Sequence, residues 1–160
     1  MVQHVEGDRP VAFARSGDIV EVRLGDEERD LVANLAGQFH SLLTEGPGPD
    51  QRRLYPTAYP DDPDRDADYA ELVHDDLLRS RLEAADVVTA TVGNDTLEPD
   101  ELEQWMVVLN SLRLVLGTRL DISEADEFDP EAPDVAERSL LLWLGMLIEE
   151  AVEASLGFLP

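Results

Sequence analysis

The sequence predicts a mainly α-helical protein, a compact bundle of four to five helices with an N-terminal β-hairpin. Large apolar residues recur every three to four positions over most of the chain after residue 26, as on one face of a helix. Residues 11–24 instead alternate apolar and polar residues around a Ser-Gly-Asp turn. The 160 residues and their hydrophobic fraction of 43% suit a single domain over residues 1–160. Within it we expect a frayed segment at 1–9, the hairpin at 10–24 and the bundle at 26–156.

The hairpin is expected in the stretch VAFARSGDIVEVRL, from Val11 to Leu24. Its turn contains Gly17, because glycine adopts positive φ without steric cost. A two-stranded hairpin is marginal alone, so one of its faces should lie on the helices.

The first helix is expected to open at Gly25-Asp26, where Asp26 can cap it. The sequence EGPGP at residues 45–49 ends it, since glycine and proline break helices. Its apolar stripe is expected to consist of Leu31, Leu35, Phe39 and Leu42.

Three further helices follow by the same periodicity. One begins after Asp64 and continues to Val92, with an expected break near Ser80, and the next starts at Thr96–Pro99 and carries Leu112 and Leu116 on its apolar face. The acidic residues 121–133 are predicted to form a loop. The last helix is expected from about Pro133 to Leu156.

The chain is strongly acidic, with 36 Asp and Glu against 12 basic residues and a formal charge of −24. All 12 basic residues are arginine. Such a charge repels phosphate backbones and anionic lipids, so we expect no direct nucleic-acid or membrane partner. The acidity fits solubility, salt adaptation or recognition of basic partners, and the sequence leaves the three open.

Catalytic and metal-binding motifs are missing from the sequence. Cysteine is absent, the three histidines lie far apart, and neither a GxSxG elbow nor a phosphate-binding glycine loop occurs. We therefore expect no enzyme activity, no catalytic residues, no metal and no cofactor. The longest apolar run, Leu140 to Ile148, is too short to span a bilayer, and the first residues do not resemble a signal peptide, so we expect a cytoplasmic protein.

The stretch RLYPTAYPDDPDRDADYAELVHDD, residues 53–76, has two interpretations. Alternating aspartates resemble the start of a calcium loop, but the required glycine and glutamate are missing in both registers. Acids that cap a helix N-terminus are the favoured interpretation. The tyrosine-proline steps could pin the loop to the core or form a rigid recognition surface. The candidate partner-binding residues are Tyr55, Pro56, Tyr59, Asp61 and Asp62.

The stretch NSLRLVLGTRLD, residues 110–121, places Arg113 and Arg119 among leucines. A buried arginine needs carboxylates or carbonyls as partners. One interpretation is a structural clamp between these arginines and carboxylates on a neighbouring helix. The other is an anion pocket that the arginines form with an amide. The candidate residues for the clamp or the pocket are Asn110, Arg113, Arg119, Asp75 and Asp76, with Glu149 as a further clamp partner.

The blocks LYPTAYPDDPDRDADYAELVHDDLLRSRL and LNSLRLVLGTRLD, followed by a helix with a tryptophan, resemble an actinobacterial domain-of-unknown-function family. Its genes commonly lie beside the gene for the Clp-protease adaptor ClpS. The resemblance covers nearly the whole chain and implies a cytoplasmic bacterial protein linked to regulated proteolysis. It supplies no catalytic residues. Some members are labelled as transcriptional regulators.

We therefore expect a non-catalytic protein-interaction or regulatory module with a protein partner, which the resemblance places in the Clp proteolysis machinery. One alternative is a small-anion-binding protein or enzyme that uses the arginine cluster. Another is a transcriptional regulator without a basic DNA-binding surface. The sequence leaves a homodimer open.

Overall fold

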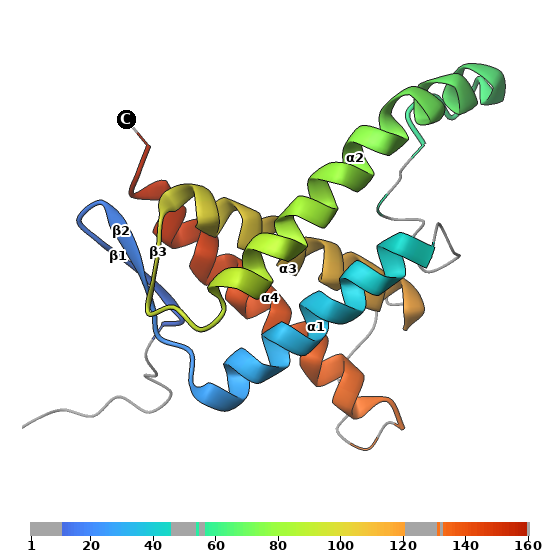
Figure 1. Cartoon of the computed structure of the whole chain (residues 1–160). Coiled ribbons are helices and arrows are strands. Elements are labelled where there is room, and N and C mark those ends of the chain that lie inside the picture. Colours follow the sequence, from blue (N-terminus) through green and yellow to red (C-terminus); the bar gives the residue numbers. More distant parts are fainter. Residues whose placement is uncertain (1–10, 46–53, 55–56, 121–130, 132, 160) are drawn as a thin grey trace, which may run out of the picture.

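The computed structural model describes residues 11–45, 54, 57–120, 131 and 133–159. The four helices and the N-terminal hairpin found within these residues confirm the predicted fold class (Figure 1). In chain order the elements are β1 (Phe13–Ser16), β2 (Ile19–Val22), α1 (Asp26–Glu45), α2 (Pro63–Thr91), β3 (Thr96–Leu97), α3 (Pro99–Arg119) and α4 (Val135–Leu156). The expectations for residues 1–9 and 121–130 lie outside the described residues. No helix in the described ranges combines the length and the apolar content that crossing a bilayer requires.

The hairpin forms where the alternation predicts it, and a third strand extends it. Strands β1 and β2 pair antiparallel, and Gly17 in the turn has a φ of 63°. On the other edge of β2, Val20 pairs with Leu97 of β3. Residues 96 and 97 therefore form a strand and not, as the sequence predicts, the start of α3. That helix begins only at Pro99, where the Glu101 carboxylate accepts the Glu98 N–H at 2.8 Å, so the preceding residues remain extended.

Helix α3 is the centre of the core, since α2 and α4 both pack against it and the sheet contacts it as well. Its Trp105 is fully buried and joins three elements. The indole N–H donates to the Thr91 hydroxyl of α2 at 2.8 Å. The Phe13 ring of β1 meets the indole edge to face, with the ring centroids 5.7 Å apart.

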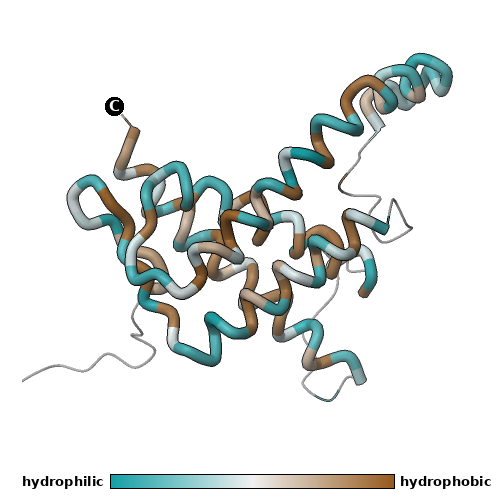
Figure 2. Tube along the Cα trace, viewed as in Figure 1, coloured by the Kyte–Doolittle hydropathy of each residue, from teal (hydrophilic) through white to brown (hydrophobic). Residues whose placement is uncertain are grey.

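Helix α2 is one continuous helix of 29 residues, and the expected break near Ser80 does not occur. Neither proline nor glycine stands between Asp64 and Thr91, so nothing interrupts its backbone hydrogen bonds. Its buried residues begin only at Ala84. The outer half projects beyond the rest of the molecule and is mostly hydrophilic (Figures 1 and 2).

The apolar stripe expected on α1 is rotated by about one position. Val32, Ala36, Phe39 and Leu43 are the buried residues of this helix. Leu35 and Leu42 are only partly buried, and Leu31 is exposed. Leu35 and Leu42 pack against the edge of the core and also line an open groove.

Candidate functional site

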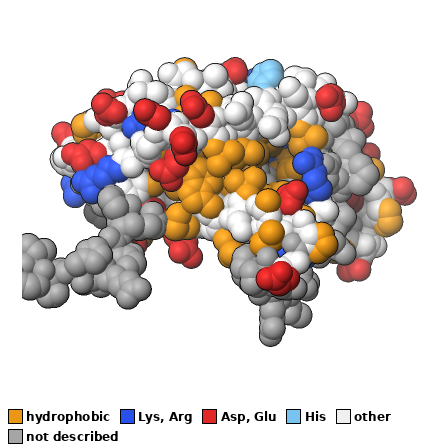
Figure 3. Space-filling view, turned by 90° about the horizontal axis from the view of Figure 1, so that it is seen from below, with side chains coloured by type: hydrophobic (Ala, Val, Ile, Leu, Met, Phe, Trp, Pro, Cys, Tyr) orange, Lys and Arg blue, Asp and Glu red, His pale blue; other side chains and the backbone are white. Residues whose placement is uncertain are grey.

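Helices α1 and α4 both lie along α3 and leave an open groove of about 660 Å³ between them. Large apolar side chains from all three helices line this α1–α4 groove. They are Leu35, Phe39 and Leu42 of α1, Leu112, Val115 and Leu116 of α3, and Leu140 and Leu144 of α4. On the face of the molecule shown in Figure 3, hydrophobic side chains gather in the middle, with charged side chains around them.

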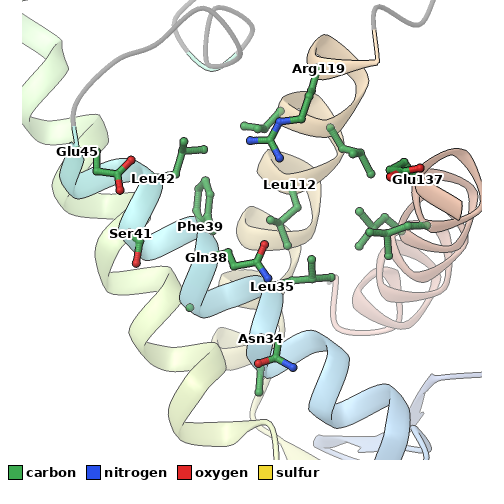
Figure 4. A pocket seen from close by; sticks show the side chains of 16 residues that line it. Asn34, Leu35, Gln38, Phe39, Ser41, Leu42, Glu45, Leu112, Arg119 and Glu137 are labelled. Atoms are coloured by element: carbon green, nitrogen blue, oxygen red, sulfur yellow. The ribbon is translucent and has the colours of Figure 1, made fainter. Parts of the chain in front are cut away.

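One end of the groove carries charge. Figure 4 shows Arg119 at the end of α3, with Glu45 on the α1 side and Glu137 on the α4 side. Leu35 and Leu42 lie opposite Leu112 across the space between α1 and α3. Polar groups of Asn34, Gln38 and Ser41 follow the outer edge of α1, and these lining residues complete the rim.

The groove exists because the apolar faces of α1, α3 and α4 are wider than the surfaces that pack against them. The spacing of Leu112 and Leu116 on α3 predicted a core face, yet both are only partly buried. Leu140 of α4 is likewise partly buried. At Gly37, which is exposed, the wall of α1 has no side chain, and a Cβ atom there would meet nothing within 4 Å. The groove therefore has the shape and the lining to receive a further helix or an apolar ligand.

The polar groups that line the groove include one hydroxyl residue, Ser41 of α1. Ser41 and Thr44 are the hydroxyl residues of the last turn of α1, and the Thr44 hydroxyl is hydrogen-bonded to the Ser41 carbonyl at 2.9 Å. No histidine is among the described residues that line the groove. Across the described part of the chain, no three His, Asp or Glu side chains gather where a metal ion could be held.

The tyrosine-proline-acid stretch caps α2, as its acids predicted. Asp62 is the N-cap residue, and its side chain accepts the Arg65 N–H at 3.2 Å. Asp66 accepts the N–H groups of Ala58 and Tyr59 at 2.7 and 3.0 Å. The bond from Arg65 satisfies a backbone donor of the first helical turn, and the two bonds to Asp66 satisfy donors of the loop before the helix.

The candidate partner-binding residues of this stretch have different environments. The Tyr59 ring meets the Tyr69 ring edge to face at 5.8 Å, and the Arg65 guanidinium lies 4.2 Å from its centroid. Tyr59 and Asp62 thus make contacts with the first turn of α2, and both Asp61 and Asp62 are exposed. Tyr55 and Pro56 lie outside the described residues.

The arginines of residues 110–121 do not form one cluster. Arg113 is exposed and donates to the Asn110 side chain at 2.9 Å, whereas Arg119 lines the α1–α4 groove. Six helical positions separate the two arginines, a rotation of about 240°. The expected anion pocket therefore does not assemble from Arg113 and Arg119 together.

The clamp expected between Arg113 and the acids of α2 also requires correction. Asp76 lies on the projecting half of α2 and pairs with Arg79 at 3.5 Å. Asp75 is exposed on the same half. Among the described residues, no ion pair joins Arg113 to Asp75, Asp76 or Glu149. For Asp75 and Asp76 the reason is that the outer half of α2, which carries them, projects away from the rest of the molecule (Figure 1).

The arginine that clamps the fold is Arg29, which is not among the residues predicted from the sequence. All five of its N–H donors are used. Nε donates to the Leu24 carbonyl at 2.9 Å, and Nη1 donates to the carbonyls of Val92 and Asn94 at 3.0 and 2.7 Å. Nη2 donates to the Val22 carbonyl at 3.2 Å and to the Asp95 carboxylate at 3.3 Å. A signal existed in the sequence. Arg29 is a cation near the N-terminus of a helix, where the helix dipole disfavours positive charge, so it needed another reason to be there.

A second groove, of about 640 Å³, lies along the projecting half of α2. Leu54 and Thr57 form one side, and Tyr69, Val73 and Leu77 of α2 form the other. Arg81 supports it by donating to the Leu54 carbonyl at 2.7 Å.

Comparison with known proteins identifies a family and no individual relative. The family model described as a domain of unknown function (DUF2017) matches residues 9–155. No curated protein and no solved structure matches the chain.

Proposed function

The chain belongs to the family of the domain of unknown function DUF2017, and we propose that it is a non-catalytic protein-interaction module whose α1–α4 groove binds an amphipathic helix of a partner protein. The observation that carries this proposal is the groove itself, with partly buried leucines of three helices along its length. Soluble proteins use such grooves to receive the apolar face of a partner helix.

The shape of the groove supports a helical occupant. Its walls are two helices and its floor is a third, so an added helix would take the place of a missing member of the bundle. The occupant would insert large side chains at spacings of three, four and seven residues between Leu35 and Leu42 on one side and Leu140 on the other. Burial of these leucines removes apolar surface from water, which is the main source of affinity in such complexes.

The charge of the chain supports a partner helix whose exposed flanks are basic. The formal charge of −24 attracts cations over the range of the Debye length, about 8 Å at physiological ionic strength. At the charged end, Glu45 and Glu137 can meet Lys or Arg of the partner, and Arg119 can meet a carboxylate. We propose further, from the resemblance described above, that this partner belongs to the Clp proteolysis machinery in the cytoplasm.

A photo-crosslinking experiment tests this proposal. A benzophenone amino acid replaces Gln38, which is exposed at the rim of the groove. The matched control places it at Leu142, which is 61% exposed on α4 and does not line the groove. We expect one discrete adduct from position 38 only, and mass spectrometry should locate the crosslink in an amphipathic, basic helical segment of the partner.

The variant Gly37→Trp sharpens the test. The indole ring would extend from the open wall of α1 into the groove. Its Cβ displaces nothing, because no atom lies within 4 Å of that position. We expect it to abolish the adduct from position 38 while circular dichroism remains unchanged. Equal adducts from positions 38 and 142, or an adduct that persists in Gly37→Trp, would contradict the proposal.

A further inference from the structure

We infer that the projecting arm is a second docking surface, independent of the α1–α4 groove, and that it binds a cationic polypeptide segment carrying one aliphatic anchor residue. The arm consists of residues 57–81, that is, the loop before α2 and the outer half of that helix. The inference depends on three properties of the arm: exposed apolar side chains beside a groove, local rigidity, and charge.

The arm exposes apolar side chains that the core does not use. Tyr69 is 45% exposed and Leu77 37% exposed, and both line the groove along the arm. Val73 lies between them, one helical turn from each, and lines the same groove. On this helix face the three side chains form a continuous apolar strip. A strip of this kind on an exposed helix is typical of a contact surface.

The tip of the arm is held rigid by contacts of its own. Asp66 accepts two backbone N–H groups of the loop, and the Tyr59 ring contacts both the Arg65 guanidinium and the Tyr69 ring. At the other end, Arg81 holds the carbonyl of Leu54, which is 1% exposed. The groove along the arm is therefore formed before a ligand arrives, and a preformed site loses less conformational entropy on binding.

The negative charge of the arm favours a cationic ligand. Residues 57–81 contain eight Asp or Glu and three Arg. Asp66 and Asp76 line the groove itself, and Asp68 and Glu71 are exposed on the same helix. A second copy of the chain would bring an arm of the same net charge, so the arm favours a different, cationic partner. The groove volume of about 640 Å³ accommodates an aliphatic side chain and its flanking backbone.

The test uses the full-length protein and fluorescent nonapeptides at low salt. One peptide has a central leucine among lysines, and its control has asparagine in the central position. We expect the leucine peptide to bind about tenfold more tightly, since burial of a leucine side chain is worth about that factor or more. Leu77→Gln should remove this difference.

The matched control variant is Leu72→Gln. Leu72 is 78% exposed on the same arm but does not line the groove, so this change should leave both affinities unaltered. Gly37→Trp should also leave them unaltered, which separates a failure here from a failure of the α1–α4 groove. Circular dichroism of Leu77→Gln should show an intact α2.

Several results would overturn the inference. The first is that the leucine peptide fails to bind. The second is that the leucine and asparagine peptides bind with equal affinity. The third is that Leu72→Gln loses as much affinity for the leucine peptide as Leu77→Gln does. A wild-type dimer that Leu77→Gln converts to a monomer would show that a second copy covers the arm, and would also overturn it.

Discussion

Removal of the Arg29 guanidinium should destabilise the protein more than the loss of any exposed arginine. In Arg29→Ala, the carbonyls of Val22, Leu24 and Val92 lose a charged donor at partly buried positions. The bonds to Asn94 and Asp95 are exposed, and water can replace them.

The magnitude follows from the three partly buried bonds. A hydrogen bond to a charged group contributes about 1.5–3 kcal/mol, and these three share one side chain that is 13% exposed. Partial hydration of the freed carbonyls reduces the sum, so we expect a loss of roughly 3–4 kcal/mol in the free energy of unfolding. For a chain of this size that corresponds to a fall in Tm of roughly 6–16 °C.

Urea denaturation of Arg29→Ala, followed by circular dichroism, measures this loss. Arg23→Ala is the matched control, because Arg23 is about half exposed and pairs with Glu21 on the surface. Both variants remove one cation from an acidic chain, but an exposed pair contributes only about 0–1 kcal/mol. Arg29→Lys should lose most of the same stability, since an ammonium group cannot reach acceptors in so many directions.

The difference between Arg29→Ala and Arg23→Ala should persist in 1 M salt, where the Debye length is about 3 Å. A loss of less than about 1 kcal/mol in Arg29→Ala, or a loss equal to that in Arg23→Ala, would refute the clamp. So would a loss that disappears in high salt, because it would then come from long-range charge repulsion.

Three further changes test other parts of the structure. Thr91→Val should lower the free energy of unfolding by about 1–3 kcal/mol and change the Trp105 fluorescence, because the buried indole N–H loses its acceptor. Thr91→Ser, which keeps a hydroxyl, is the control. Full stability of Thr91→Val would contradict this prediction. Gly145→Ala should raise the free energy of unfolding by about 0.5–1 kcal/mol, since its Cβ meets nothing within 4 Å inside α4, and a fall in Tm would show otherwise. The hydrogen bond and charge of Arg23 lower the pKa of Glu21, so any stability from this pair is present above the ordinary carboxyl range and is lost as the pH falls through the lowered pKa. An NMR titration of Arg23→Gln should show the Glu21 pKa rising towards the ordinary value of a glutamate carboxyl, and an unchanged pKa would assign the shift to another group.

Local sequence signals predicted most elements of the fold. Gly17 marked the hairpin turn, the alternating aspartates marked the start of α2, and Pro99 stands at the first position of α3. Each of these signals acts through the backbone of a few neighbouring residues, so a single sequence contains them in full. Strand β3 was not predicted, because a segment of two residues is too short for its sequence pattern to distinguish a strand from the start of a helix.

The candidate sites were predicted less well, because they depend on contacts between distant segments. Arg119 was singled out and lines the α1–α4 groove, but its expected companion Arg113 points elsewhere on α3. Arg29 donates hydrogen bonds to residues that lie between 63 and 66 positions further along the chain. Hydrophobic periodicity contains no information about partners so distant in the sequence. The projecting half of α2 could not be foreseen either, since its apolar spacing is the same as that of a packed helix.

The sequence by itself determined the helices, the hairpin, the acidic surface and the apolar stripe on each helix, because all of these follow from residue type and local periodicity. Only the tertiary structure decided which stripes are buried. Leu109 reaches the core, whereas Leu35 and Leu112 border a groove and Leu77 borders another on the arm. The physical reason is that an apolar stripe needs a covering surface, and whether one is present depends on how helices distant in the sequence pack together.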